Sequence, residues 1–520
     1  MEVFAGGIDA SDAVFTELIA TIDDTMKDRE APVSIRHRTL QLALTAVCGI
    51  GQSNPGAYFL RRNLFPTLVS MVTSPETQHI TFEAMLLLAL LSTFHKSDAA
   101  NLNPYLRAIQ DCVDQDFMTR ICWTASYAGD AAVKSYRAIA DDTPPTFTSS
   151  IGSLVSSSLL RSEQPWTPIE ATAVLLPIYE YLGMNPMFCA VFLRPFSEPR
   201  DAKAPAPPRA ISPLPHTLLV LSSYTLTHAS STASPRALAY AQLSLNMLLV
   251  CAENGEIMRA FCQPAEGEIR LCRQRLPLLP PGRSSRPLAC VLLDCLTLWL
   301  RHNLQKRLEV TAYDTCLRTV HRILSFLQTE RIRLEHHWEE LWQGILGLME
   351  FLPSRVDTIK SIRGSYELVQ LAVVVLAFAI SSDFFPAPKG LHQLVVSIKP
   401  GYEIVRSSAT ILKQRELLAA LKVPLPESRR DVEGQAQRVD VTLQAIEKMI
   451  KYYGDKLAES KARSAADYLR VISREIDKDG VRGFESVQPE EPSKKRGDSK
   501  ADVNFTRWAC EDGMALMAVG

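Results

Sequence analysis

The sequence predicts an all-α fold, arranged as an armadillo- or HEAT-like helical solenoid with proline- and serine-rich loop insertions. Three observations favour it. Apolar residues recur at three- and four-residue spacing along most of the chain, and no stretch alternates between apolar and polar residues. Many of these apolar stripes are about 15 to 20 residues long, with short polar or proline-bearing turns between them. Diverged paired-helix repeats have this appearance, and such solenoids usually present binding surfaces rather than catalytic pockets.

The helices are expected in a definite order. The first spans residues 11–26, and its stripe consists of Val14, Phe15, Leu18, Ile19 and Ile22. Similar stripes predict helices over 35–50, 57–72, 80–95, 168–192, 287–306, 310–328 and 391–421. A further helix is expected to begin at Ser234-Pro235, an N-cap followed by a first helical position, and to end at Asn254-Gly255.

Three segments interrupt the helical pattern and divide the chain. One is rich in Ser and Thr, one carries seven prolines, and one is a charged tail before a short terminal helix. The predicted division is N-terminal helical repeats over 1–140, the Ser/Thr-rich insertion over 141–167, a helical repeat over 168–194, the proline-rich loop over 195–215, a C-terminal armadillo-like helical region over 216–480, and the tail with its terminal helix over 481–520.

Composition excludes several classes of protein. Lys and Arg (56) nearly balance Asp and Glu (57), so no overall field draws the chain to nucleic acid or anionic lipid. The eleven cysteines form no CxxC pair and most lie among apolar residues, which favours buried, reduced thiols in a cytosolic or nuclear protein. The N-terminus lacks the basic and apolar regions of a signal peptide, so secretion is not expected.

The most apolar run extends from Leu368 to Ser382. Its 15 uncharged residues fall short of the ~18 to 20 that a membrane-spanning helix needs. We therefore interpret it as a buried core helix, with a transmembrane segment as the alternative.

Motifs for enzyme chemistry are missing from the sequence. It holds no GxxxxGK[ST] phosphate loop, no GxSxG elbow, no HExxH and no DxDxDG calcium loop. The nearest candidate is RIRLEHHWEELWQG at residues 331–344, in which His336 and Glu340 are expected on the side of a helix opposite to Trp338 and Trp342. Two ligands need a third to hold a metal ion, and nothing in the sequence nominates one. We interpret the stretch as a packing helix and predict no catalytic, cofactor-binding or metal-binding residue; a hydrolase would need a nucleophile and a base that no motif supplies.

A basic stretch, IRLCRQRLPLLPPGRSSRP, spans residues 269–287, with no acid between Glu268 and Asp294. Its arginines are Arg270, Arg273, Arg275, Arg283 and Arg286. Guanidinium groups bind carboxylates and phosphates through paired hydrogen bonds, so this is a candidate site for a protein partner. A solvated loop is the alternative, and the lack of interleaved aromatics argues against single-stranded nucleic acid.

A second candidate surface is FTSSIGSLVSSSLL, residues 147–160. In a helix its apolar face would consist of Phe147, Ile151, Leu154, Val155 and Leu159, opposite a face of serines. A helix without cations gains little from anionic lipid and would bind by inserting apolar side chains into loosely packed membrane. Peripheral membrane contact is therefore a hypothesis for these residues, and docking on the protein's own helices is the alternative.

Several segments resemble the armadillo-like helical domain-containing protein 3 family. FEAMLLLALLSTFHKSDAANLNPYL at 82–106 is similar to its leucine-rich helix and Asn-Pro-Tyr turn, and SRPLACVLLDCLTLWLRHNL at 285–304 to its Arg-Pro-Leu helix. HWEELW at 337–342 and DFFP at 383–386 fit the same pattern. The resemblance covers roughly residues 10–480, is to a fungal-type member, and includes the family's C-terminal armadillo-like helical region. Against it, the chain is expected to lack further N-terminal helices, and the proline-rich loop and charged tail are its own.

The resemblance implies a non-catalytic adaptor at the cytosolic face of the Golgi. Such proteins support recruitment of a phosphatidylinositol 4-kinase, supply of phosphatidylinositol 4-phosphate and Golgi organisation, and they are associated with a large Arf exchange factor. No cofactor is implied, and the family role is not carried onto particular residues. The alternative is a general protein-binding solenoid in the cytosol or nucleus without a Golgi role.

Overall fold

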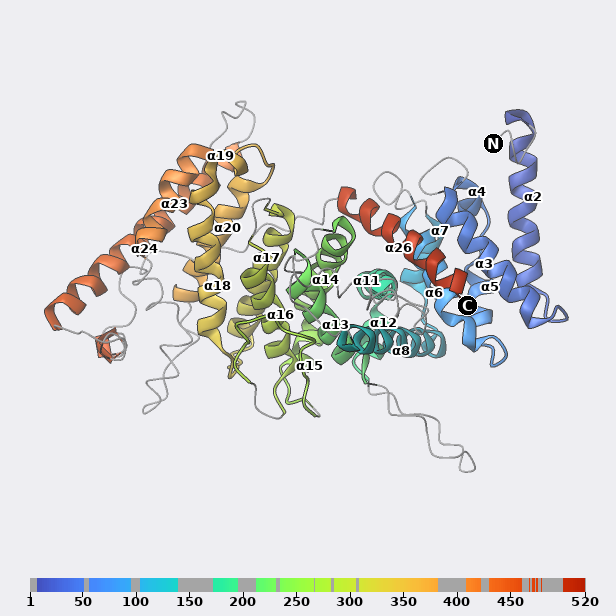
Figure 1. The fold of residues 1–520 in the computed structure, drawn as a ribbon, viewed down its shortest axis with the longest axis horizontal. Coiled ribbons are helices and arrows are strands. Elements are labelled where there is room, and N and C mark those ends of the chain that lie inside the picture. The colour runs from blue at the N-terminus through green and yellow to red at the C-terminus, as the bar shows by residue number, and fades with distance from the viewer. Residues whose placement is uncertain are drawn as a thin grey trace, which may run out of the picture.

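Helices stack side by side along one long axis in the computed structural model (Figure 1). The structure describes residues 7–50, 56–94, 103–138, 172–194, 212–230, 234–265, 267–281, 285–304, 308–381, 408–421, 430–460 and 499–519, with a few positions between 467 and 478. Within these ranges the regular secondary structure consists of α- and 3-10 helices, with no β-strand. The predicted all-α solenoid is confirmed.

The longer helices have the following bounds: α2 Ile8–Lys27, α3 Val33–Ile50, α4 Gly56–Arg61, α5 Phe65–Thr73, α6 Thr81–Thr93, α7 Pro104–Asp111, α8 Gln115–Ala138, α11 Leu175–Met184, α12 Pro186–Phe192, α13 Leu214–His228, α14 Pro235–Glu253, α15 Gly255–Phe261, α16 Leu288–His302, α17 Val310–Thr329, α18 Trp338–Phe351, α20 Ser365–Ser381, α23 Ser408–Leu421, α24 Arg430–Ser460 and α26 Ser499–Val519. Short helical turns, η1 Gln78–Ile80, η3 Thr172–Val174, η4 Pro353–Arg355 and α19 Val356–Ile359, connect some of them.

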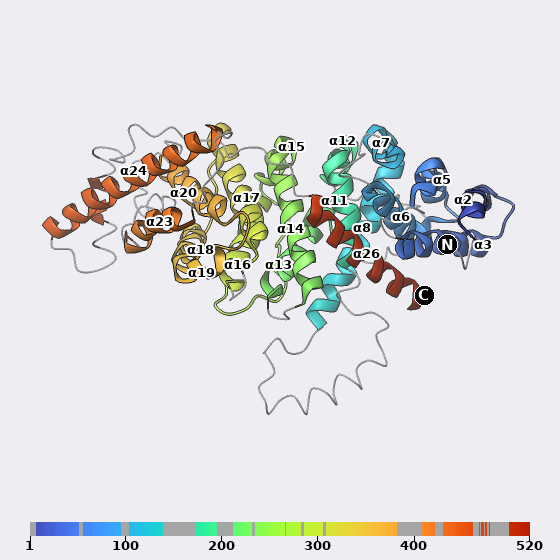
Figure 2. The same ribbon diagram turned by 90° about the horizontal axis from the view of Figure 1, so that it is seen from above.

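The helices form two layers that follow the long axis (Figures 1 and 2). In the first layer, successive neighbours are α3, α6, α11, α14, α17, α20 and α24; in the second, they are α8, α13, α16, α18 and α23. The pairs α13–α14, α16–α17 and α18–α20 pack across the layers. Each helix therefore buries one apolar stripe between neighbours in its own layer and the other layer, which is why the three- and four-residue spacing was informative.

Capping residues set the ends of α14 as the sequence predicts. The Ser234 side chain accepts a hydrogen bond from the Ala237 N–H, and Pro235 occupies the first helical position, where a missing N–H costs nothing. Asn254 ends α14 and its side chain accepts from the Glu256 and Ile257 N–H groups, so it also begins α15. One asparagine thus separates two helices with a sharp corner.

Three predicted helices have different bounds in the structure. The expected helix over 57–72 is α4 and α5, divided by residues 62–64, where the Asn63 side chain accepts from the Phe65 N–H in the turn before α5. Of the expected helix over 168–192, residues 168–171 lie outside the described residues, and the rest is η3, α11 and α12, with α11 and α12 divided at Asn185, whose side chain accepts from the Phe188 N–H. Of the segment 391–421, α23 occupies residues 408–421 and the earlier part lies outside the described residues. The Asn185 cap divides an apolar stripe without ending it, so the stripe alone could not show this corner.

The apolar run that begins at Leu368 is a core helix. It forms most of α20, and Leu368, Ala372, Val375, Leu376 and Ala379 on it have no exposed surface. Among the described residues, no single helix is both long and apolar enough to cross a membrane. Residues 172–184 and 186–192 reach that length and composition only as a pair, and the two parts are bent by 119°.

The outer end of the solenoid is less buried than its middle. In α2, Ile19 and Ile22 are buried, whereas Val14 and Leu18 of the predicted stripe are each 38% exposed, because α2 lies at the end of the stack and packs mainly on α3, α4 and α5. All eleven cysteines are free thiols, and nine are buried; Cys48 and Cys112 are half-buried.

The last helix departs from the order of the chain. α26 packs on α3, α6, α11 and α14, far from α24, which precedes it in sequence (Figures 1 and 2). The C-terminus therefore returns to the N-terminal half of the solenoid.

Candidate partner interface

The basic stretch predicted from the sequence is a surface loop between α15 and α16; residues 268–286 are called the basic loop below. Its backbone is hydrogen-bonded to two helices of the second layer. The Cys272 N–H donates to Ser223 Oγ (2.8 Å) and His228 Nε2 donates to the Arg273 carbonyl oxygen (2.7 Å), both on α13. Arg137 of α8 donates to the Arg270 carbonyl oxygen (3.2 Å). These bonds anchor residues 270–273 of the loop to α8 and α13.

The tip of the basic loop exposes apolar side chains next to arginines. Leu276 is 82% exposed and Leu278 is 57% exposed, while the neighbouring Arg275 is half-buried. The Leu279 N–H donates to Gln274 Oε1 (2.9 Å) and closes the tip. Arginines beside exposed apolar groups are typical of the centres of protein interfaces. Sequence reasoning missed the leucines; their signal was the alternation with proline in LPLLPP, which keeps them out of a buried helical stripe.

Arg286, at the far end of the loop, lies inside the protein. Its guanidinium donates to both carboxylate oxygens of Asp294 on α16 (2.5 and 3.0 Å) and to His336 Nδ1 (2.9 Å). Burial raises the pKa of Asp294 to about 6, an effect that Arg286 opposes, and burial lowers the pKa of His336. The structure thus separates Arg286 from Arg270, which is exposed, and from Arg273 and Arg275, which are half-buried; one guanidinium nitrogen of Arg273 is buried. Arg283 lies outside the described residues.

The stretch at 331–344 holds a packing helix, but His336 is not where the sequence placed it. α18 begins at Trp338, so His336 precedes the helix and points to Arg286 instead of lying on the helix's solvent side. Glu340 forms an ion pair with Arg301 of α16. The prediction is wrong for His336, which lies before the helix, and Glu340 lies on α18 as predicted but is paired with α16. In the described parts of the chain, no group of three His, Cys, Asp or Glu side chains is arranged to hold a metal ion.

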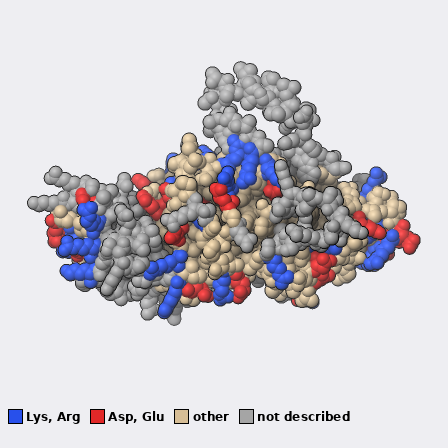
Figure 3. Space-filling view, turned by 90° about the horizontal axis from the view of Figure 1, so that it is seen from below, with Lys and Arg blue, Asp and Glu red and all other residues tan. Residues whose placement is uncertain are grey.

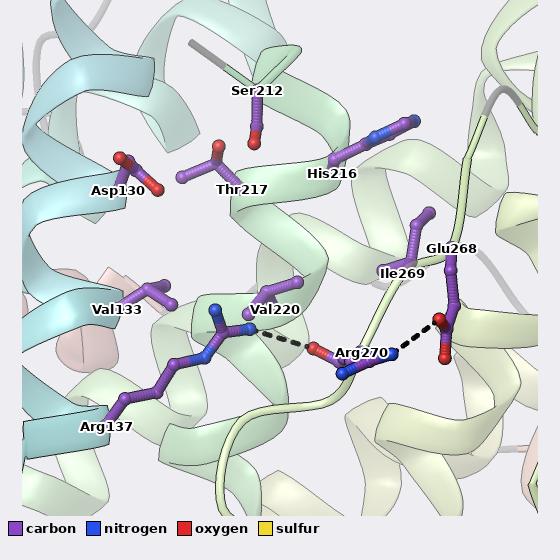
Figure 4. A pocket seen from close by; sticks show the side chains of 10 residues that line it. All are labelled: Asp130, Val133, Arg137, Ser212, His216, Thr217, Val220, Glu268, Ile269 and Arg270. Atoms are coloured by element: carbon purple, nitrogen blue, oxygen red, sulfur yellow. Dashed lines mark hydrogen bonds and ion pairs between the residues drawn. The ribbon is translucent and has the colours of Figure 1, made fainter. Parts of the chain in front are cut away.

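A small polar hollow lies beside the first residues of the basic loop (Figure 4). It lies between α8, α13 and the loop and is lined in part by Asp130, Arg137, His216 and Glu268. Within the loop, Arg270 is paired with Glu268 (2.9 Å), and Arg137 of α8 donates to the Arg270 carbonyl oxygen. With a volume of about 200 Å³ it is smaller than most ligand pockets.

Basic side chains gather on the face that contains this region. Figure 3 shows Lys and Arg grouped in the middle of the lower face, with Asp and Glu at the border of the group. A local positive patch of this kind appears although the whole chain has a net charge of −1. The five residues of the membrane hypothesis, Phe147, Ile151, Leu154, Val155 and Leu159, lie outside the described residues.

The C-terminal part of the chain, which begins at the end of the basic loop, is similar to a known protein family. The family model for the C-terminal region of armadillo-like helical domain-containing protein 3 matches residues 286–480, from the end of the basic loop through α24. The chain is therefore a relative of the armadillo-like helical domain-containing protein 3 family. Its predicted family resemblance is thereby confirmed, and the fold named by the family agrees with the solenoid described above.

Curated relatives extend the similarity beyond the matched region. Armadillo-like helical domain-containing protein 3 of Homo sapiens is 20% identical, and the match covers 90% of this chain and 71% of the human protein. The Danio rerio protein of the same name is 22% identical, and the match covers 77% of this chain and 62% of the Danio rerio protein. A Schizosaccharomyces pombe protein named UPF0588 membrane protein is 25% identical, and the match covers 72% of this chain and 61% of that protein. The chain thus spans about two thirds of the length of these relatives. Their names describe a helical domain or a membrane protein and no enzyme.

Proposed function

We propose that this protein is a non-catalytic helical scaffold at the cytosolic face of the Golgi, where it presents the basic loop to a phosphatidylinositol 4-kinase. In this role it supports phosphatidylinositol 4-phosphate supply and Golgi organisation. Similarity to that family supports the choice of partner. The observation that carries the binding role is a loop whose backbone is bonded to α8 and α13 while Leu276 and Leu278 point to solvent.

The geometry suits binding for a physical reason. Ordering a flexible loop costs affinity, and this loop is already ordered by hydrogen bonds to two helices. Exposed leucines supply apolar area to bury, and the flanking arginines supply paired donors for carboxylates of the partner. An acidic segment with apolar side chains is the chemistry that fits such a surface.

Capture of the purified organism-matched kinase tests the proposal. Replacing Arg275 with Glu and Leu276 with Asp together should weaken capture by at least about 30-fold, the loss of about 2 kcal/mol typical of an interface hot spot. Val113→Asp is the matched control, because Val113 is 78% exposed and lies between α7 and α8. Equal capture by the loop variant and the control would remove the loop from the interface, and no capture by the wild type would remove the kinase as partner.

A large Arf exchange factor is a second proposed partner, and membrane contact through residues 147–160 is part of the same proposal. Replacing Ile151, Leu154 and Val155 with Asp should release the protein from liposomes with packing defects, because charged groups resist insertion. Flotation of the variant with the liposomes at the wild-type level would end the membrane hypothesis.

A further inference from the structure

α26 binds the first helical layer through one face. Its buried side includes Phe505, Ala509 and Leu516, which recur at four- and seven-residue spacing and pack towards α3, α6 and α14. The opposite side carries Arg507, 69% exposed, and Glu511, 49% exposed, which are paired with each other at 3.1 Å. The faces of α3, α6, α11 and α14 that contact α26 are called the α26-binding surface below.

A buried charge fixes the register of α26. Asp512 is 1% exposed, and its carboxylate accepts a hydrogen bond from Arg236 Nε at 3.1 Å. A second nitrogen of Arg236 and the hydroxyl of Tyr240 contact the same carboxylate. Both partners come from α14, so the α26-binding surface has a site for one carboxylate at one position of a helix.

The residue after that carboxylate has to be small. A Cβ atom added to Gly513 would lie 2.7 Å from Leu86 Cδ2 of α6, and Leu86 is fully buried. Helix α26 therefore approaches α6 at Gly513 more closely than a larger residue permits. The surface thus selects a helix by shape and charge together: an Asp-Gly pair with an aromatic residue seven positions before the aspartate and Leu four positions after it.

Three features make α26 separable from the solenoid. It is joined to α24 through residues 461–498, so it is a distant segment that docks, not the next helix of the stack. It carries Lys500, Arg507, Glu511 and Asp512, whereas α20 is almost free of charge, so an undocked α26 is compatible with water. The Arg236 side chain is 22% exposed while docked, so water reaches it when Asp512 leaves.

We propose that the α26-binding surface is a protein-interaction site that accepts the α26 helix of a second copy of this chain in place of its own. The contacts that hold α26 in one chain, Asp512 to Arg236 and Tyr240 and Gly513 against Leu86, are reproduced between two chains. Exchange of a docked terminal element is a known route from monomers to dimers. This inference is independent of the basic loop and of its proposed partner, because α26 lies on the other helical layer.

Two complementary full-length variants test the exchange. Asp512→Asn removes the carboxylate of α26 and leaves the α26-binding surface unchanged. Arg236→Gln removes the guanidinium of that surface and leaves α26 unchanged. When the two variants are mixed one to one, they should form a heterodimer. In it, the intact α26 of the Arg236→Gln chain binds the intact α26-binding surface of the Asp512→Asn chain. Sedimentation velocity should show each variant alone as a monomer, with association in the mixture at least about 30-fold tighter than self-association, since truncating one partner of a buried charge pair costs that much.

Glu511→Gln is the matched control, because it makes the same change one residue away on the exposed side of α26. Mixed with Arg236→Gln it should give no heterodimer, since its own α26 still occupies its surface. A mixture of Asp512→Asn and Arg236→Gln that sediments as the sum of two monomers would overturn the proposal.

Amide hydrogen exchange on the wild-type chain tests the same opening of α26 without any substitution. Amides of α26 should exchange at least about tenfold faster than those of α14, because α26 opens without the rest of the solenoid. Equal protection of the two helices would show that α26 is a permanent part of the core and would contradict exchange.

Discussion

The two ends of the basic loop carry the same residue type in opposite environments. At one end the Arg270 side chain is 77% exposed and pairs with Glu268, which is 56% exposed. At the other end the Arg286 side chain is 14% exposed and pairs with Asp294, which is 3% exposed. The guanidinium–carboxylate distances are similar, at 2.9 and 2.5 Å, so geometry alone does not separate the two pairs.

What separates them is the cost of losing one partner. An exposed charge that loses its partner is hydrated by water, and such pairs contribute little to stability. A buried carboxylate that loses its guanidinium is left without compensation in a medium of low dielectric constant. Arg286 therefore stabilises the fold, whereas the Arg270 side chain is available to bind a partner.

Replacing Arg286 with Ala should have the largest effect on stability. We expect a loss of about 3 to 5 kcal/mol in the free energy of unfolding, because Asp294 and His336 lose their shared partner. The midpoint of urea unfolding measures it. The double variant with Arg286→Met and Asp294→Leu should recover much of the loss, since no charge is then left unpaired. A double variant as unstable as the single one would show that packing, and not the charge, is responsible.

The loss caused by Arg286→Ala should depend on pH. Burial raises the pKa of Asp294 from 3.8 to about 6, so the folded chain binds this proton more tightly than the unfolded chain. The carboxyl's contribution to stability is therefore fully present below about pH 4 and is lost as pH rises through about 6. Without Arg286 the pKa of Asp294 in the folded chain should rise further. The difference in free energy of unfolding between wild type and Arg286→Ala should therefore become smaller as the pH is lowered from about 8 to about 5. Unfolding midpoints of both proteins at several pH values measure it, and a deficit that stays constant would exclude ionised Asp294 as its cause.

The comparison also shows which parts of the molecule can be predicted from sequence. Helix α14 could be predicted with its ends, because Ser234, Pro235 and Asn254 act on backbone groups within three residues. The corner at Asn185-Pro186 carries the same kind of signal and could have been found, although the apolar stripe that runs through it obscured it.

Long-range pairs leave no such local signal. The Arg286 side chain meets His336, 50 residues away, and Arg236 meets Asp512, 276 residues away. Periodicity reports which face of a helix is apolar but not which other helix covers it, so neither the burial of Arg286 nor the docking of α26 follows from the spacing of residues. The basic loop could be predicted as a cluster of arginines, and only the packing of α16 and α18 shows that one of them is structural.

The smallest effect on stability is expected at the other end of the loop. Arg270→Ala should leave the midpoint of urea unfolding unchanged, because both Arg270 and Glu268 are exposed and water replaces their contact. The carbonyl oxygen of residue 270 still accepts from Arg137, so the loop keeps its backbone conformation. Capture of the kinase should weaken, and more so at low ionic strength, where exposed charges are least screened. Measuring unfolding and capture on the same preparation separates the two roles. A variant that unfolds as readily as Arg286→Ala would show that the exposed pair supports the fold after all, and the two ends of the loop would then differ in exposure but not in function.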